Sequence, residues 1–224
     1  MQSQQAEVTW KDGVPVSDRF DDPYYSLNDG LAETRHVFLQ GNDLPARFRD
    51  GFQVAELGFG TGLNLLATVA AWRGAKVPGR LRYASFEMFP MAAPDVAQEL
   101  QHFPDMADLS AELCAALAQS LPQFTLAGGI EVDLIIGDAR DCLPGWAGQA
   151  DAWYLDGFSP AKNPELWAPD LMQAVFDHTV PGGTAATYSA AGLVKGGLRE
   201  AGFDVIRTPG FGRKRHMTTA RRPG

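Results

Sequence analysis

The sequence has few of the residues that build metal centres and disulfide frameworks. Its 224 residues include two cysteines, Cys114 and Cys142, which form no CxxC pair, and four histidines without ligand spacing. A structural metal site needs clustered ligands, and a disulfide framework needs several paired cysteines. We therefore expect no metal and no disulfide-stabilised fold.

Long apolar runs are also absent. No segment approaches the roughly 18 consecutive apolar residues that a membrane-spanning helix requires. The opening Met1-Gln2-Ser3-Gln4-Gln5 is polar and lacks the apolar core of a signal peptide. These features predict a cytoplasmic protein that does not bind membranes.

Basic residues are scarce relative to acidic ones. Lysine and arginine total 19 and aspartate and glutamate 27, so the net charge is −8. Such a balance disfavours indiscriminate nucleic-acid binding, because phosphate contacts require cations. The stretch 206–224 nevertheless has several cations and no acid, namely Arg207, Arg213, Lys214, Arg215, Arg221 and Arg222. It is either a local basic face or a solvated final strand.

A glycine-rich turn organises the chain. An apolar strand over 53–57 contains Glu56, and Gly58, Gly60 and Gly62 follow it at alternate positions before a helix over 63–72. Glycines let a ligand approach the backbone closely, and the helix N-terminus points at the turn. The pattern predicts a nucleotide-like ligand, although a tight turn without a ligand has the same sequence requirements.

The spacing distinguishes between cofactors. A dinucleotide fingerprint would need its third glycine at position 63, where this chain has Leu63. The acid-x-Gly-x-Gly-x-Gly pattern is instead typical of Rossmann-like S-adenosylmethionine methyltransferases. In those enzymes the acid, here Glu56, holds the methionine end of the cofactor directly or through water.

Strand and helix signals alternate along the chain. They predict an α/β fold with a seven-stranded, mostly parallel sheet and one antiparallel edge. We expect strands at 53–57, 81–87, 131–136, within 151–160, and at 185–189, 203–207 and 215–221. We expect helices at 63–72, within 95–119 with an interruption at Pro104, and at 166–179 and 190–201, a loop at 121–129, and a turn at 181–184.

Three acids follow successive strands, where the carboxyl ends of parallel strands open into a ligand crevice. Glu87 is the expected ribose ligand, or else an ordinary exposed carboxylate. Asp138 and the backbone of Ala139 are expected at the adenine ring, although Asp138 also suits a helix N-cap. Asp156 is expected beside the transferable methyl group.

Residues 1–50 precede the first predicted strand of the sheet and form an expected extension or lid on a methyltransferase domain at 51–224. The whole chain is expected to be a single domain. Tyr24, Tyr25 and Phe38 are candidates to cover a cofactor or to stack on a base. The alternative is a hydrophobic strap that anchors the N-terminus.

The chain resembles a specific family, the methyltransferase domain of the bifunctional tRNA 5-methylaminomethyl-2-thiouridine biosynthesis enzyme (MnmC type) and its stand-alone relatives. Two runs are the most specific: Leu155-Asp156-Gly157-Phe158-Ser159-Pro160-Ala161-Lys162-Asn163-Pro164 and Gly210-Phe211-Gly212-Arg213-Lys214-Arg215. Other matching segments cover nearly the whole chain: 21–26, 30–34, 37–42, 56–64, 85–87, 151–154 and 181–184.

The resemblance implies a class I S-adenosylmethionine-dependent enzyme that methylates the amine of 5-aminomethyl-(2-thio)uridine at the tRNA wobble position. This chain ends at Gly224 and holds no second glycine fingerprint, so only the methyl-transfer step is expected. A separate oxidase or another enzyme would then supply the aminomethyl group. Two rival readings stay open: a small-molecule N-methyltransferase, and a catalytically silent cofactor-binding partner of a tRNA-modification oxidase.

The resemblance also implies roles for individual residues. Asp156 would orient the substrate amine and accept its proton, although a structural or cofactor-binding aspartate is the alternative. The remaining cofactor contacts would include Asn42, Asn64 and Met88. The anticodon stem-loop of tRNA would be held through base stacking on Tyr24, Tyr25 and Phe158, and through phosphate contacts to Lys162, Arg213, Lys214 and Arg215.

Overall fold

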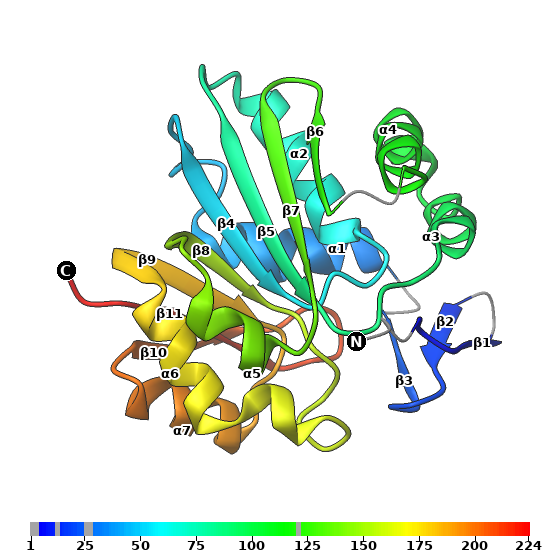
Figure 1. The fold of residues 1–224 in the computed structure, drawn as a ribbon. Coiled ribbons are helices and arrows are strands. Elements are labelled where there is room, and N and C mark those ends of the chain that lie inside the picture. Colours follow the sequence, from blue (N-terminus) through cyan, green and yellow to red (C-terminus); the bar gives the residue numbers. More distant parts are fainter. Residues whose placement is uncertain (1–4, 12–13, 25–28, 120–121) are drawn as a thin grey trace.

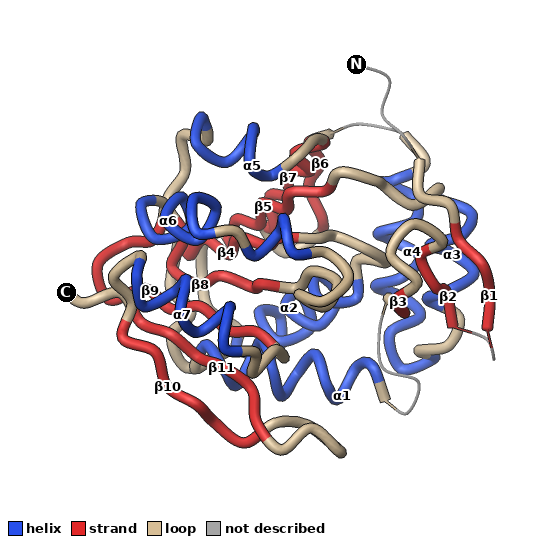
Figure 2. The backbone as a smooth tube through the Cα atoms, turned by 90° about the horizontal axis from the view of Figure 1, so that it is seen from below, coloured by secondary structure: helices blue, strands red, loops and turns tan. Residues whose placement is uncertain are grey.

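A mostly parallel sheet lies between two layers of helices (Figures 1 and 2). The computed structural model describes residues 5–11, 14–24, 29–119 and 122–224. Eight strands form the sheet in the order β10-β11-β9-β8-β4-β5-β7-β6. They are β4 (Phe52–Leu57), β5 (Leu81–Glu87), β6 (Gln123–Leu126), β7 (Ile130–Ile136), β8 (Ala150–Leu155), β9 (Thr179–Thr187), β10 (Asp204–Pro209) and β11 (His216–Arg221).

The predicted α/β class and mostly parallel sheet are confirmed. Strands β7, β5, β4, β8 and β9 run parallel, whereas β11 is antiparallel to both β9 and β10. The eighth strand is β6, which lies within the predicted loop 121–129. It pairs antiparallel with β7 across a short hairpin, so its backbone is ordered by the sheet even though it is only four residues long.

The start of β9 also differs from the prediction. The proposed turn at 181–184 lies inside one continuous strand, and its pairing with β8 is irregular between Ala150 and Ala152. Gly182 takes a positive φ of 75° there. A bulge therefore accommodates Pro181, Gly182 and Gly183 without ending the strand.

The helices cover opposite faces of the sheet. Two separate apolar cores result, because neighbouring strand residues point to opposite faces. Val54 and Tyr154 belong to the core under α2, whereas Ala55 and Trp153 belong to the core under α6 and α7. The helices are α1 (Gly30–Thr34), α2 (Leu63–Ala75), α3 (Ala93–Leu100), α4 (Ala107–Leu117), α5 (Ala139–Cys142), α6 (Pro169–Asp177) and α7 (Gly192–Glu200).

The N-terminal segment has structure of its own. Strands β1 (Val8–Lys11), β2 (Val14–Ser17) and β3 (Asp22–Pro23) form a small antiparallel sheet beside the main one (Figure 1). Helix α1 then leads into a π-helical turn over Arg35–Leu39 that packs against α2. Within the described residues, no helix is long and apolar enough to cross a membrane.

Candidate functional site

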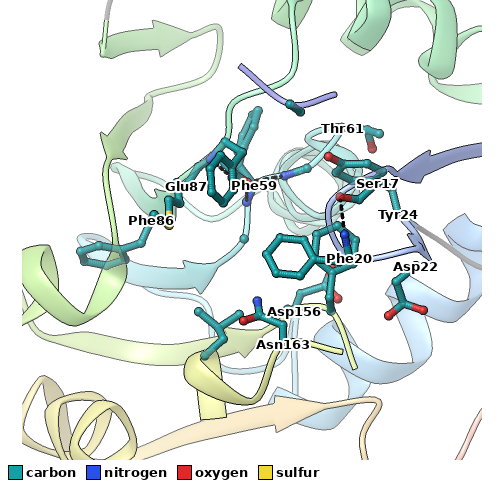
Figure 3. A pocket seen from close by; sticks show the side chains of 18 of the residues that line it. Ser17, Phe20, Asp22, Tyr24, Phe59, Thr61, Phe86, Glu87, Asp156 and Asn163 are labelled. Carbon is teal, nitrogen blue, oxygen red and sulfur yellow. Dashed lines mark hydrogen bonds between the residues drawn. The ribbon is translucent and has the colours of Figure 1, made fainter. Parts of the chain in front are cut away.

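A cavity of about 1230 Å³ opens where the parallel strands end. Its walls come from the glycine turn after β4, the ends of β5, β7 and β8, and the N-terminal segment (Figure 3). Single-ligand pockets usually measure about 300–1,000 Å³. The volume is therefore sufficient for a cofactor together with part of a second molecule.

The glycine turn requires its glycines at two positions. Gly58 has a φ of 89°, and a Cβ built on it would meet the carbonyl oxygen of Asp156. Gly62 has a φ of 77° at the start of α2, where a Cβ would lie 2.8 Å from Leu113 and 2.9 Å from Phe59. Side chains at either position would disrupt the turn that forms the cavity floor.

Two carboxyl groups meet at one amide beside this turn. Nδ2 of Asn64 donates to Oε1 of Glu56 at 2.8 Å and to Oδ2 of Asp156 at 2.6 Å. Ser85 donates to the other Glu56 oxygen at 2.7 Å. Glu56 is fully buried, and only Asn64 and Asp156 line the cavity. Asn64 thus connects the motif acid of β4 with the acid that follows β8.

Burial makes both acids hard to ionise. It raises the pKa of Asp156 to about 7 and the pKa of Glu56 to about 8, against the stabilising hydrogen bonds from Asn64. Glu33 raises the Asp156 pKa further, whereas the positive charge of Lys214 lowers it. Asp156 can therefore gain or lose a proton near neutral pH, as a general acid or base must.

Glu87 links the end of β5 to the glycine turn. Its Oε2 accepts hydrogen bonds from the backbone N–H groups of Phe59 (2.9 Å) and Gly60 (3.1 Å), and its Oε1 accepts from Phe89 (2.7 Å). A carboxylate has about four acceptor positions. Glu87 lines the cavity with capacity for about one further donor, so two ribose hydroxyls would have to displace a backbone contact.

The third expected acid lies on the same wall. Asp138 caps α5 by accepting from the backbone N–H of Arg140 at 2.9 Å, and it also pairs with the Arg140 guanidinium. These hydrogen bonds lower the pKa of Asp138. Asp138, Ala139 and the exposed Met88 all line the cavity. The capping alternative therefore applies, and it leaves Asp138 facing the cavity.

Aromatic rings from distant segments close the cavity. Phe20 stacks on Phe158 with 4.8 Å between ring centroids, and Tyr24 meets Phe158 edge-on at 5.2 Å. Arg19 lies over Phe89 at 4.7 Å. Figure 3 shows Phe20 and Tyr24 facing the side of the cavity formed by Phe59 and Glu87. The N-terminal segment is therefore part of the cavity wall.

Three predicted cofactor residues do not line the cavity: Asn42, Glu56 and Gly62. Asn42 is fully buried, donates to the carbonyl groups of Phe38 and Trp153, and accepts from Thr184. This side chain fastens the N-terminal segment to β8 and β9, so it corrects the expectation of a cofactor contact. Glu56 reaches the cavity only through Asn64. Tyr25 lies outside the described residues.

The basic candidates separate in space. Lys214 lines the cavity mouth, pairs with Glu33 at 2.8 Å and lies 4.2 Å from the centroid of the Tyr188 ring. Arg213 and Arg215 are exposed on either side of it and do not line the cavity. Lys162 contacts Asp21 and Asp22 rather than the cavity. Only one of the four predicted cations is therefore part of the cavity wall.

A family model described as S-adenosyl-L-methionine-dependent methyltransferase matches residues 103–223. The chain belongs to this family. Its cofactor is S-adenosylmethionine, as the glycine motif predicts. The solved structure of MNMC2 from Aquifex aeolicus has the same fold, with a TM-score of 0.75 at 22% identity, over 100% of this chain and 73% of that one.

Curated relatives match almost the whole chain. The chain is 42% identical to the tRNA 5-methylaminomethyl-2-thiouridine biosynthesis bifunctional protein MnmC of Marinobacter nauticus, over 97% of this chain and 37% of that protein. It is 44% identical to the protein of the same name from Caulobacter vibrioides, over 97% and 38%. The chain thus spans less than two fifths of the length of these relatives.

The residues present fit S-adenosylmethionine. Gly58 leaves open the space that a side chain would fill, and Glu87 and Asp138 bring two carboxylates to the same wall. Acceptors of this kind suit the hydroxyl and amino groups of an adenosine moiety. Glu87, Asp138 and the backbone of Ala139 would hold the nucleoside part, with Asn64 and Asp156 nearer the reacting end.

Several cavity residues were not predicted as site residues, among them Phe20, Phe89, Glu33 and Tyr188. Phe20 and Glu33 precede the glycine turn by more than 25 residues, and Tyr188 follows it by more than 120. Nothing in their local pattern indicates a ligand. Only Glu33 carried a signal, because it lies in a segment shared with the resembled family.

Proposed function

We propose that this chain methylates the primary amine of a 5-aminomethyl-(2-thio)uridine base at the wobble position of tRNA. The observation that carries the proposal is the Asp156 carboxyl, which lines a cavity large enough for two ligands and titrates near neutral pH. The printed name of the relatives places them in the biosynthesis of the methylaminomethyl base. Acting on tRNA implies a cytoplasmic location.

The substrate amine must lose a proton to react. When bound, S-adenosylmethionine supplies an electrophilic methyl group on a sulfonium sulfur. An alkylammonium has a pKa of about 10.4 in water, so the free amine is the minor form at neutral pH. The ionised Asp156 carboxylate would hydrogen-bond to the nitrogen, align it and take up the proton as the nitrogen–carbon bond forms.

The base itself must leave the anticodon stack to reach this carboxylate. Phe158 and Tyr24 border the cavity on the side of Asp156 and offer aromatic surface to a displaced pyrimidine. Lys214 at the mouth would meet the substrate first, and exposed Arg213 and Arg215 would contact backbone phosphates. A separate enzyme would supply the aminomethyl group.

Transfer of labelled methyl groups tests this function. Three samples are compared: tRNA bearing 5-aminomethyluridine, tRNA without that modification, and no RNA. Label in the first sample alone supports the proposal. Label transferred to a small amine without RNA would indicate a small-molecule methyltransferase, and no label despite confirmed cofactor binding would indicate a silent partner of an oxidase.

The Asp156→Asn variant then tests the acid. Asparagine keeps the size and can accept a hydrogen bond from Asn64, but it cannot take up a proton. We expect turnover to fall by about 10²-fold or more, in the range of a lost general base. Cofactor affinity, measured by calorimetry, should stay within about threefold. Turnover near the wild-type rate would exclude Asp156 as the proton acceptor.

A further inference from the structure

A threonine from the N-terminal segment completes the hydrogen-bond network of the two acids. Thr34, the last residue of α1, donates from Oγ1 to Oδ1 of Asn64 at 2.9 Å. Asn64 is the residue whose Nδ2 donates to both Glu56 and Asp156. Thr34 and Asn64 are both buried, with 6% and 5% of their surface exposed. One hydroxyl thus lies two hydrogen bonds from each acid.

The amide of Asn64 can satisfy these neighbours in one orientation only. A side-chain amide has one acceptor oxygen and a nitrogen with two hydrogens. The Thr34 hydroxyl engages the oxygen, so both hydrogens point to the carboxyl groups. Without the hydroxyl, the buried oxygen would lose its donor and the amide would rotate to find another. Rotation would remove a donor from Asp156.

We propose that Thr34 is a positioning residue for methyl transfer, because its hydroxyl fixes Asn64 and Asn64 in turn holds Oδ2 of the ionised Asp156. Oδ1 of Asp156 is then assigned to the substrate amine. This inference rests on the function proposed above for the catalytic role of Asp156. It places a determinant of the reaction in the first 50 residues, outside the glycine motif and outside the strand ends.

Charged groups around Asp156 come from several elements and stay constant when Thr34 is changed. Glu56 lies on β4, Glu33 on α1, and Lys214 between β10 and β11. Tyr188 follows β9, and its own pKa is raised by Asp156 and by Asp22 on β3. Replacing Thr34 alters none of these charges. A changed titration of Asp156 would therefore report the loss of its hydrogen-bond donor.

The test compares Thr34→Val with Thr34→Ser. Valine keeps the shape and removes the hydroxyl, whereas serine keeps the hydroxyl. The Asp156 carboxyl is titrated by carbon-13 NMR in the free protein and assigned with Asp156→Asn. We expect Thr34→Val to raise the Asp156 pKa by about 0.5 pH unit or more, because the charged form loses a donor. Thr34→Ser should titrate like the wild type.

Kinetics supply the second readout. With tRNA bearing 5-aminomethyluridine at pH 7, Thr34→Val should lower kcat about tenfold and move the acid limb of the pH profile upward. The dissociation constant of S-adenosylmethionine should change by less than about threefold, since Thr34 acts through Asn64. Should Thr34→Val fail to fold, Thr34→Ala removes the same hydroxyl with a smaller side chain.

Thr68→Val is the matched control. Thr68 is fully buried on α2 and donates to the backbone carbonyl of Asn64, 3.0 Å from the Tyr154 hydroxyl. Its loss should reduce stability comparably but leave the Asp156 titration unchanged. An unchanged titration in Thr34→Val, or a Thr34→Ser variant as defective as Thr34→Val, would overturn the inference.

The titration also separates this inference from the proposed function. A raised Asp156 pKa together with wild-type kcat in Thr34→Val would uphold the positioning of Asp156 and would instead refute its role as proton acceptor.

Discussion

Glu87 occupies the point where two parts of the cofactor site meet. Its carboxylate accepts from the backbone of the glycine turn and from Phe89, so it shapes the turn and also faces the cavity. A charge-assisted hydrogen bond of this kind is stronger than one to a neutral acceptor. Both uses depend on the negative charge of one side chain.

Glu87→Gln should therefore weaken S-adenosylmethionine binding by about tenfold, equivalent to about 1.4 kcal/mol. The amide would point its NH₂ group at backbone N–H donors and lose acceptor capacity toward the cofactor. Calorimetry measures the change. Glu131→Gln, which alters an exposed carboxylate paired with Arg80 on β7, is the control. A dissociation constant equal to the wild-type value would remove Glu87 from the cofactor site.

Glu56 makes stability depend on pH in an unusual direction. Its pKa is raised by burial from an ordinary value of 4.5 to about 8, so the fold favours the protonated form. This contribution is fully present below about pH 4.5 and is lost as the pH rises toward 8. Asp156, with a pKa raised to about 7, acts in the same direction.

The free energy of unfolding should consequently fall by about 1–3 kcal/mol between pH 5 and pH 8 in the wild type. Glu56→Gln, which is neutral at every pH, should flatten this decline. Urea denaturation at several pH values measures both. If the variant and the wild type lose stability in parallel, ionisation of Glu56 is not the cause.

At the scale of elements, the loop after β8 is tied to the N-terminal segment. Asp22 on β3 accepts from the backbone N–H of Ser159 at 2.9 Å, and Lys162 from the same loop contacts both Asp21 and Asp22. The stacked rings of Phe20 and Phe158 join the same two segments. Together these contacts close one side of the cavity.

Asp22→Ala should loosen this closure. Amide hydrogen exchange over residues 157–163 should accelerate by about tenfold, because a hydrogen bond and an ion pair are lost together. Asp21→Ala provides the comparison, since Asp21 is 76% exposed at its side chain and exposed ion pairs contribute little. Equal exchange in Asp22→Ala and the wild type would show that the loop is held by the aromatic contacts alone.

At the scale of the whole molecule, an acidic protein must present positive charge to bind RNA. The loop between β10 and β11 does so beside the cavity mouth, since Lys214 lines the mouth and its neighbours Arg213 and Arg215 are exposed. The net charge of −8 makes such a local patch the main source of attraction for phosphate.

Replacing Arg213 and Arg215 by glutamine should weaken tRNA binding and reduce its salt dependence by about one in slope per lost phosphate contact. Cofactor affinity should not change. Arg80→Gln, at the opposite end of the strands from the cavity, is the control. A salt slope identical to that of the wild type would place the RNA elsewhere on the surface.

Periodicity and turn chemistry were sufficient to predict the sheet core. The strand at 81–87 has the observed limits, and the helix interruption at Pro104 separates α3 from α4. Local patterns carry this information because buried strands and proline breaks depend mainly on neighbouring residues. The short edge strand β6 was missed, since its order comes from pairing with β7 rather than from its own pattern.

The sequence by itself determined the parallel α/β architecture, the cofactor class and the strand-end acids that line the cavity, Glu87, Asp138 and Asp156. Only the tertiary structure decided that Asn64 joins Glu56 to Asp156, that Thr34 orients Asn64, and that Lys214 alone among the expected cations lines the mouth. The reason is physical: motif spacing reflects local backbone geometry, whereas hydrogen bonds between residues 30 to 181 positions apart form only when the chain packs.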